Sequence, residues 1–416
     1  MTPEIKQRIE QIRRGNVPEG YQKTKDAIFP TDWHTQKMKQ WVALAERPVT
    51  LEDDKRYRLV TVRRGFGGVD LRGEYLGKDI LVKNYFRARQ GDFLISKRQI
   101  AHGACGVVPE SLDGAVVSNE YNVFVPNQGT NIEMFNLMMQ LPHYTRLFYL
   151  MSDGVHIEKL LFKTQDWMRR QLAMPPIEEQ QKIAAILTTQ DKVIELKEKR
   201  LVEKQRQKKY LMQQLLTGKK RLPGFNGAWK TDCLGKVFFE RKETNCENIE
   251  MLAITGTQGI IPRKELDLKD NSSEDKSKYL RVCVGDIGYN TMRMWQGVSA
   301  YSNYEGIVSP AYTILKPSSS INAKYFAYLF KMSEIVFLFY RFSQGLVDDT
   351  RNLKYENFKK IKVCYPPDMK EQTAIAEVLS AADREIDLLQ QDIEQEKQKK
   401  KALMQLLLTG IVRVKT

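Results

Sequence analysis

Apolar residues recur at a spacing of seven in two long stretches of the chain. The first line consists of Leu187, Ile194, Leu201 and Leu215, and the second of Leu379, Ile386, Ile393 and Leu407. A proline pair precedes each stretch and a glycine follows it, which is typical of helix starts and stops. We therefore predict two helices of ~40 residues, each ~60 Å long.

The sevenfold spacing favours a coiled-coil seam between these helices. Lys208 and Lys400 interrupt the seam at matching positions. A single amphipathic helix packed on a globular domain is the alternative interpretation.

The distribution of charge predicts how the helices run. Residues 197–221 carry ten basic and two acidic side chains, and residues 383–396 carry six acidic and one basic. Residues 178–195 carry four acidic and two basic side chains, and residues 397–401 carry four basic ones. An antiparallel pair places basic against acidic segments at both ends, whereas a parallel pair places acid against acid at the start. We therefore expect an antiparallel two-helix coiled coil.

The two helical stretches are copies of each other. PPIEEQQKIAAIL at residue 175 is repeated as PPDMKEQTAIAEVL at residue 366, and LMQQLLTG at 211 as LMQLLLTG at 403. From Glu179 onward the two copies align without gaps at an offset of 192. Weaker matches flank them, including Gly91-Asp92 with Gly285-Asp286 and Trp33 with Trp229. Their common order indicates that the whole chain is a duplication of one unit.

Each copy combines a globular segment with a long helix. Short alternating runs predict strands, and residues 132–150 and 323–340 predict one helix each. The predicted fold is α/β, with two pseudo-symmetric domains separated by the antiparallel coiled coil. The predicted segments are an N-terminal helix (1–20), a first domain (21–174), a central helix (175–220), a second domain (221–365) and a distal helix (366–416). The pattern of Ile5, Ile9 and Ile12 before Gly15 resembles a long-helix end, so the two chain ends could complete one copy.

Composition narrows the possible partners and compartment. The net charge of +15 favours nucleic acid, although a basic protein without a polyanionic partner is the alternative. The five cysteines form no C-x-x-C pair and the four histidines are dispersed, so we expect no metal site. No apolar run suits a membrane span or a secretory signal, and we expect a cytoplasmic protein.

Motifs for catalysis are missing from the sequence. There is no phosphate-binding G-x-x-x-x-G-K-[ST], and the glycines at 65, 67 and 68 do not match the dinucleotide fingerprint. The proline pairs lack the neighbours of an adenine-methylase motif, and no Ser/His/Asp set is duplicated. Duplicated domains without a duplicated catalytic constellation indicate a binding protein.

The loops after the strands provide candidate DNA-binding residues. Arginine and lysine suit guanine, and asparagine and glutamine suit adenine, in the major groove. Taken singly, each could also be a solvated loop residue. The candidates are Arg63, Arg64, Lys97, Arg98, Gln99 and His102 in the first domain, and Thr255, Gln258, Arg263, Asn290, Arg293, Trp295, Gln296, Gln344, Asp349 and Arg351 in the second. The two copies differ most in these loops, as expected if each reads a different sequence.

The duplicated P-P-x-x-E-Q-x-x-I-A-x-x-L helix, its L-x-x-x-L-L-T-G end and the two variable domains resemble the specificity subunit of type I restriction-modification enzymes. The distal copy departs by one inserted residue before Glu371-Gln372. The stretches NTMRMWQG (290–297) and IVSPAY (307–312) resemble one subtype of target recognition domain.

The resemblance implies a non-catalytic subunit that binds a split, asymmetric site on double-stranded DNA. Each recognition domain would read one half in the major groove, and the helix pair would set the gap between the halves. The implied partners are two adenine methyltransferase (modification) subunits and up to two ATP-dependent translocase and nuclease (restriction) subunits. S-adenosylmethionine, ATP and Mg²⁺ would bind to those partners.

Two other functions remain open from the residues alone. A fused nuclease or methyltransferase would modify or cut DNA as the purified chain. A coiled-coil scaffold without a DNA role would show no binding in its assembled complex.

Overall fold

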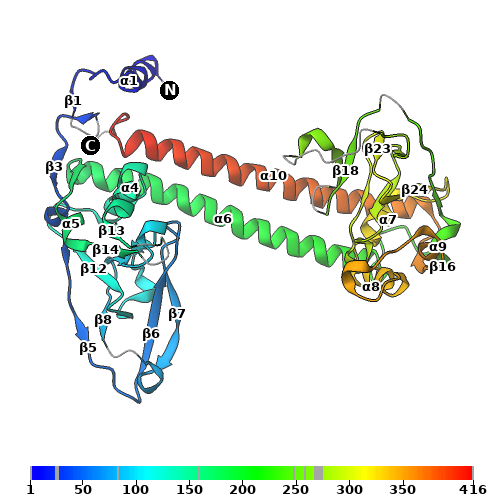
Figure 1. The fold of residues 1–416 in the computed structure, drawn as a ribbon, viewed down its shortest axis with the longest axis horizontal. Coiled ribbons are helices and arrows are strands. Elements are labelled where there is room, and N and C mark those ends of the chain that lie inside the picture. The colour runs from blue at the N-terminus through cyan, green and yellow to red at the C-terminus, as the bar shows by residue number, and fades with distance from the viewer. Residues whose placement is uncertain are drawn as a thin grey trace. The chain divides into compact units, whose positions relative to one another are not determined.

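Both stretches with sevenfold apolar spacing form uninterrupted helices in the computed structural model of the protein (Figure 1). α6 (Ile177–Leu215) and α10 (Met369–Leu407) contain 39 residues each. The structure describes residues 2–23, 28–81, 84–154, 156, 160–246, 249–256, 259–266 and 275–414. No helix within these ranges combines the length and the apolar character needed to cross a membrane.

Glycines end both helices as the sequence predicts. Gly218 and Gly410 adopt the left-handed backbone conformation with φ of 70° and 69°. A side chain at Gly410 would lie 2.5 Å from Pro30, so the close approach of this segment also requires glycine.

The chain divides into two compact units, and each contains part of both long helices. The first unit consists of Met1–Leu196 and Ile393–Thr416, and the second of Lys197–Asp392. Both chain ends therefore belong to the first unit. Its N-terminal segment contacts its C-terminal segment, since Tyr21 donates to the Gly410 carbonyl (2.7 Å) and Arg8 to the Ile411 carbonyl (2.9 Å).

The helices run antiparallel within each unit, which confirms the prediction from charge. In the first unit, Gln190 bonds Glu396 at 2.6 Å and Lys400 pairs with Asp191 at 2.6 Å. In the second unit, the ion pairs are Lys197 with Asp392, Lys204 with Glu385 and Lys208 with Asp383. In the second unit the partners on α10 fall in number as those on α6 rise, and in the first unit Glu179 at the start of α6 pairs with Arg413 after the end of α10, so the helices are antiparallel in both.

The predicted seam is buried except at one position. The buried seam residues are Leu187, Ile194, Leu215, Leu379, Ile386, Ile393 and Leu407, and Leu201 is half-buried. Lys208 and Lys400 occupy seam positions because each ammonium group reaches an aspartate on the other helix. The two interruptions are thus paired charges.

A buried ion pair links the start of each long helix to the segment after the other. Glu179 is held by Arg413 with two contacts of 2.8 and 2.7 Å, and Arg413 also contacts Asp32. In the second unit, Arg221 holds Glu371 at 2.6 and 2.8 Å. Hydrogen bonding to Arg413 lowers the pKa of Asp32. Arg221 and Arg413 stand in the same position of the repeat.

The first unit contains a four-stranded sheet in the order β10-β9-β12-β4 and a five-stranded sheet in the order β5-β8-β11-β6-β7. All strand pairs are antiparallel except β11 with β6. The elements before α6 are α1 (Pro3–Arg13), β1 (Tyr21–Lys23), β2 (Ile28–Pro30), β3 (His34–Lys37), α2 (Met38–Trp41), β4 (Val42–Leu44), β5 (Pro48–Val49), β6 (Arg56–Val62), β7 (Val69–Leu76), η1 (Gly77–Asp79), β8 (Tyr85–Arg87), β9 (Phe93–Ser96), η2 (Ile100–His102), β10 (Cys105–Val107), η3 (Glu110–Leu112), β11 (Val116–Ser118), β12 (Tyr121–Pro126), α3 (Ile132–Met139), α4 (Pro142–Leu150), β13 (Ser152–Asp153), β14 (Leu161–Phe162), α5 (Thr164–Met168) and β15 (Gln171–Met174).

The second unit repeats the four-stranded sheet, with the order β17-β24-β21-β22. Where the first unit has five strands, the described residues of the second form the pairs β18-β19 and β20-β23. The elements between α6 and α10 are β16 (Lys230–Cys233), η5 (Leu234–Lys236), β17 (Phe238–Glu240), β18 (Leu252–Ile254), β19 (Ile260–Pro262), η6 (Arg263–Glu265), β20 (Leu280–Val282), β21 (Ile287–Asn290), η7 (Met294–Gln296), β22 (Ser299–Tyr301), β23 (Gly306–Val308), β24 (Tyr312–Pro317), α7 (Ala323–Leu329), α8 (Ser333–Phe342), η8 (Asp348–Thr350), α9 (Tyr355–Phe358) and β25 (Lys362–Tyr365). The shared sheet supports the predicted pseudo-symmetry.

Equivalent aromatic residues centre the two cores. Trp167 packs on Phe148 and Phe162 with ring centroids 6.0 and 5.8 Å apart. Phe358 packs on Phe330 and Phe339 at 5.8 and 6.1 Å. Burial of such rings is a large stabilising contribution to each unit.

The prediction of one helix over 132–150 and one over 323–340 is wrong, because each region forms two helices. Pro142 forces Leu141 into the extended conformation (ψ 144°) and separates α3 from α4. No proline separates α7 from α8; there the buried Met332 is extended (ψ 137°). Tertiary packing therefore decides the second break.

Replacing Arg413 with methionine should destabilise the first unit by roughly 3–5 kcal/mol, because it leaves the buried Glu179 carboxylate without its partner. Urea-induced unfolding would measure the loss. Arg14→Met is the control, since Arg14 pairs with Glu10 in solvent and should cost only ~0–1 kcal/mol. Equal losses for the two variants would contradict the structural role of the buried pair.

Reversing one charge of an interhelical ion pair should reduce the stability of the first unit, and exchanging both charges should restore it. Lys400→Asp places like charges at 400 and 191 and should cost on the order of 1 kcal/mol, whereas Asp191→Lys with Lys400→Asp should recover most of it. Thermal unfolding of the wild type, the two single variants and the double variant gives the interaction free energy of the pair as a double-mutant cycle. Additive losses would be evidence against this register.

Candidate nucleic-acid interface

The same strand–turn–strand element appears in both units and contains many of the predicted residues. In the first unit β9 and β10 flank the first turn (residues 97–104), and in the second unit β21 and β22 flank the second turn (residues 291–298). Gly103 and Gly297 each end a short 3-10 helix in the left-handed conformation, with φ of 74° and 79°. The backbone framework of the two turns is therefore shared.

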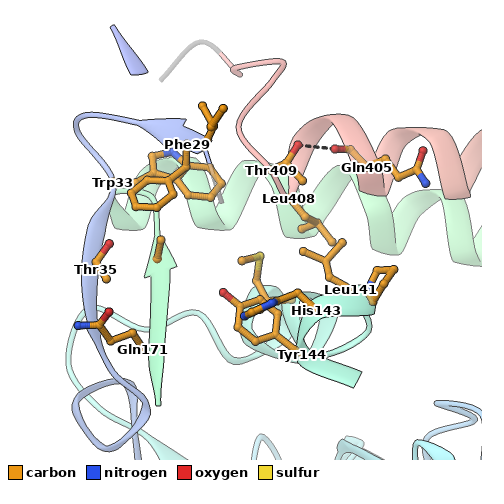
Figure 2. A pocket seen from close by; sticks show the side chains of 14 residues that line it. Phe29, Trp33, Thr35, Leu141, His143, Tyr144, Gln171, Gln405, Leu408 and Thr409 are labelled. Carbon is orange, nitrogen blue, oxygen red and sulfur yellow. Dashed lines mark hydrogen bonds between the residues drawn. The ribbon is translucent and has the colours of Figure 1, made fainter. Parts of the chain in front are cut away.

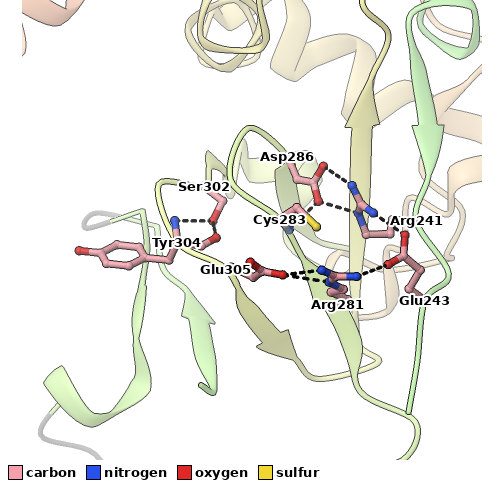
Figure 3. Close-up of polar contacts among 8 residues, drawn as sticks. All are labelled: Arg241, Glu243, Arg281, Cys283, Asp286, Ser302, Tyr304 and Glu305. Carbon is pink, nitrogen blue, oxygen red and sulfur yellow. Dashed lines mark hydrogen bonds and ion pairs between the residues drawn. The ribbon is translucent and has the colours of Figure 1, made fainter. Parts of the chain in front are cut away.

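The aspartate of each Gly-Asp dipeptide fixes the strand that leads into the turn. Asp286 is buried, binds the Arg241 guanidinium through both oxygens at 2.7 and 3.1 Å, and accepts the Cys283 amide at 2.8 Å (Figure 3). Asp92 makes the same contacts with Arg47 and the Arg89 amide. Hydrogen bonds to these carboxylates raise the pKa of Arg47 and of Arg241. These aspartates are structural and do not belong to the surface that would contact DNA.

The structure brings the two predicted groups of the first unit together. The tight turn after β6 contains Arg63 and Arg64, and it is bonded to the first turn through the backbone. The Gly65 amide donates to the His102 carbonyl (2.7 Å) and the Phe66 amide to the Gly103 carbonyl (2.8 Å). Arginines from one hairpin and polar residues from the other thus lie side by side.

Some of these side chains already have partners. Arg63 pairs with Asp70, and Arg98 pairs with Glu120 at 2.6 Å. The side-chain oxygen of Gln99 is buried and accepts no hydrogen bond from the described residues. Lys97 is half-buried, and its ammonium group has no acidic partner within the described ranges. Lys97 is therefore the candidate of the first turn most available to a ligand.

The second turn presents Arg293 and Gln296 to solvent. Neither side chain is hydrogen-bonded or ion-paired to any residue that the structure describes. Asn290 and Trp295 instead shape the turn, because Asn290 accepts the Met292 amide (3.0 Å) and the Trp295 indole donates to the Met292 carbonyl (3.0 Å). Arg293 and Gln296 of the predicted residues thus face outward, whereas Asn290 and Trp295 stabilise the turn.

A second loop of the same unit packs beside the second turn. The Leu353 amide donates to the Thr291 carbonyl at 2.9 Å. Arg351 lies 3.9 Å from the centroid of the Tyr340 ring and also pairs with Asp348, so its guanidinium is largely occupied. Gln344 is exposed, and of Asp349 only the backbone is described.

The third predicted group lies on the β18–β19 hairpin. Thr255 donates its hydroxyl to the Gly259 carbonyl at 3.1 Å, and Arg263 begins η6 after β19. Gln258 lies outside the described residues. The hairpin packs on β21, since a side chain at Gly288 would lie 2.3 Å from Ile254. The hairpin is thus attached to the strand that leads into the second turn.

Lys331, which no sequence pattern indicated, anchors the backbone of the second turn and of the strand after it. Its ammonium group donates to the carbonyls of Gly297 (2.8 Å) and Ser299 (2.6 Å). Lys331 as a whole residue is exposed, but its ammonium group is largely removed from solvent. This desolvation, together with the positive charge of Lys208, lowers the pKa of Lys331 to about 8. The repeat places Gln140 at the equivalent position, so no duplicated signal could have identified this lysine.

A cavity of about 290 Å³ in the first unit is separate from this surface (Figure 2). Its walls are mainly apolar and include Phe29, Trp33, Tyr144 and Leu408. The buried indole nitrogen of Trp33 has no hydrogen-bond partner among the described residues. None of the predicted DNA-binding residues lines the cavity, so it does not belong to the candidate interface.

Comparisons with known proteins agree on one family. The family model described as the type I restriction modification DNA specificity domain matches residues 66–206 and 233–398. A protein named as the type I restriction enzyme MjaX specificity subunit, from Methanocaldococcus jannaschii, is 23% identical over 433 residues, which cover 96% of this chain and 98% of that protein.

Two solved structures share the fold. The S subunit of a type I restriction-modification system from M. genitalium matches with a TM-score of 0.58 at 12% identity, over 96% of this chain and 100% of that one. A chain from a type I R-M system, solved in work on complex assembly and conformational transition, matches with a TM-score of 0.54 at 16% identity, over 92% of this chain and 99% of that one.

The family match includes both turns and a large part of each long helix, and together its two segments span well over half of the chain. This chain therefore belongs to the family of type I restriction-modification DNA specificity subunits.

Proposed function

We propose that this specificity subunit binds a bipartite, asymmetric site on double-stranded DNA, with each unit reading one half in the major groove. The observation that carries the proposal is the duplicated strand–turn–strand element with different outward side chains. Arg293 and Gln296 project from the second turn without partners among the described residues, and Lys97 is available on the first. Arginine and lysine pair with guanine and glutamine with adenine, so the turns are suited to different half-sites.

The net charge of +15 supports the same proposal. Phosphate contacts supply most of the affinity of proteins for DNA and make it salt-dependent. Base contacts then select the sequence. Basic side chains near both turns would position the duplex, while the few unpaired side chains on the turns would read its edges.

The long helices would set the gap between the half-sites and dock the methyltransferase subunits. Both helices carry exposed apolar side chains that a docked subunit would cover. Leu196, Val202, Tyr210 and Leu388 are each more than half exposed. The interhelical ion pairs would give this platform a defined register.

The proposed complex contains two modification subunits and up to two restriction subunits, and it would act in the cytoplasm. In this division of labour the specificity subunit performs no catalysis itself. S-adenosylmethionine would bind to the modification subunits, and ATP and Mg²⁺ to the restriction subunits. The sequence motifs missing from this chain agree with that assignment.

Replacing residues 21–174 with the recognition domain of another family member should change one half of the methylated DNA motif and leave the other half and the gap unchanged. Methylome sequencing of cells that express each version measures this directly. The reciprocal exchange of residues 221–365 should change only the other half. A change of both halves in either exchange would refute separate reading by the two units.

Arg293→Ala should relax discrimination at one base pair of the second half-site by about 1–3 kcal/mol. The measurement compares affinities of the reconstituted methyltransferase complex for the cognate duplex and for single-base variants. Arg281→Ala is the matched control, because Arg281 is an arginine of the same unit already paired with Glu243 and Glu305 (Figure 3). If both variants weaken binding equally at every base, Arg293 is not a base-reading residue.

A further inference from the structure

A cationic cleft in the first unit lies outside the predicted DNA-binding residues. It consists of two adjoining concavities of about 370 and 610 Å³, which share Leu150, Arg169 and Arg170 in their walls. Five basic side chains and a single carboxylate, Asp166, line it. The basic residues are Lys37, Arg146, Lys163, Arg169 and Arg170.

Separate secondary-structure elements place these cations. Arg146 lies in α4, Lys163 precedes α5, and Arg169 and Arg170 follow it. Lys37 is paired with Gln171 across the β3–β15 ladder, and the Arg170 carbonyl accepts the Met38 amide at 2.8 Å. Backbone hydrogen bonds thus hold the charges together on one face of the unit.

Much of the charge in the cleft is not compensated. Lys163 pairs with Asp153, and Arg169 approaches Asp166 at 3.6 Å. Across the described ranges, the side chains of Lys37, Arg146 and Arg170 have no acidic partner. Like charges held close together repel one another, so their clustering favours a polyanionic ligand.

The cleft is connected to the first turn through one strand. The Phe162 amide at the end of β14 donates to the Lys97 carbonyl at 2.9 Å, and the next residue, Lys163, lines the cleft. A DNA strand that leaves the first turn in this direction would therefore meet the cleft next.

We propose that this cleft binds the phosphodiester backbone of DNA flanking the first half-site. The inference rests on the proposed function, since it assumes that the first turn faces DNA. Phosphate contacts fix the register of a protein on the duplex without reading bases. The cleft would increase the affinity for DNA at the first half-site without changing which sequence the protein prefers there.

The described residues of the second unit do not repeat two of the unpaired cations of this cleft. Its equivalent strand pair is β16–β25, in which Cys233 is paired with Lys362. Cys233 thus takes the place of Lys37, and the buried Ile361 takes the place of Arg170. The phosphate contacts of Lys37 and Arg170 would therefore strengthen the first half of the bipartite site.

The test uses the specificity subunit reconstituted with its methyltransferase partners and the double variant Arg146→Gln with Arg170→Gln. Affinities for a cognate duplex and for a random duplex are measured over a range of salt concentrations. Each lost phosphate contact should reduce the slope of log affinity against log salt by ~0.9, or about 2 in total. Affinity should fall by the same factor on both duplexes, and the methylated motif should not change.

Two further variants serve as controls. Lys55→Gln with Lys78→Gln removes the same charge at the opposite end of β6 from Arg63 and Arg64 and should keep the wild-type salt slope. Arg146→Lys with Arg170→Lys keeps the cations and should do the same. An unaltered thermal unfolding midpoint confirms that each variant is folded.

An unchanged salt slope in the glutamine variant would overturn the proposal. Weaker assembly with the methyltransferase subunits at an unchanged slope would also overturn it and would indicate an acidic protein surface as the ligand. If the wild-type complex shows no sequence preference on any duplex, the proposed function itself fails, which is a separate result.

Discussion

The buried carboxylates at the starts of the long helices impose the constraint on which the rest of the structure depends. Burial of an unpaired carboxylate costs several kcal/mol, so Glu179 and Glu371 each require a cation. In both units that cation is the arginine that follows the glycine at the end of the other long helix. The start of one helix must therefore lie beside the end of the other, which gives the antiparallel arrangement within each unit.

The glutamine after each buried glutamate attaches the helix to its domain. Gln180 accepts the Asn131 amide and donates to the Pro175 carbonyl, and Gln372 makes the same contacts with Asn322 and Pro366. The Glu-Gln dipeptide thus joins helix, partner helix and domain at one point. Because these contacts are built into both copies, the loops that follow the strands can differ without disturbing the framework. This separation lets one framework carry two different sets of loop side chains, as the proposed reading of two half-sites requires.

The duplication also accounts for the contacts between the chain ends. In the second unit, Arg221 and Trp229 follow the end of α6 on a continuous chain. In the first unit the equivalent Arg413 comes from the C-terminal segment and Trp33 from the N-terminal one. Hydrogen bonds from Tyr21 and Arg8 to the backbone after α10 join the two segments. The N-terminal and C-terminal segments thus supply to the first unit the contacts that one continuous segment supplies to the second, despite the different connectivity.

The sequence by itself determined the two long helices, their antiparallel direction, the duplication and the family, because periodicity, charge distribution and repeated motifs are properties of the linear chain. Only the tertiary structure decided which polar loop residues are available to a ligand. Arg63, Arg98 and Arg351 are paired, whereas Arg293 has no partner among the residues that the structure describes, although all four are arginines in loops. The break between α7 and α8, the Lys331 contacts and the cationic cleft were likewise invisible in the sequence. Each depends on segments that are distant in the chain meeting in space, and no local pattern records such a meeting.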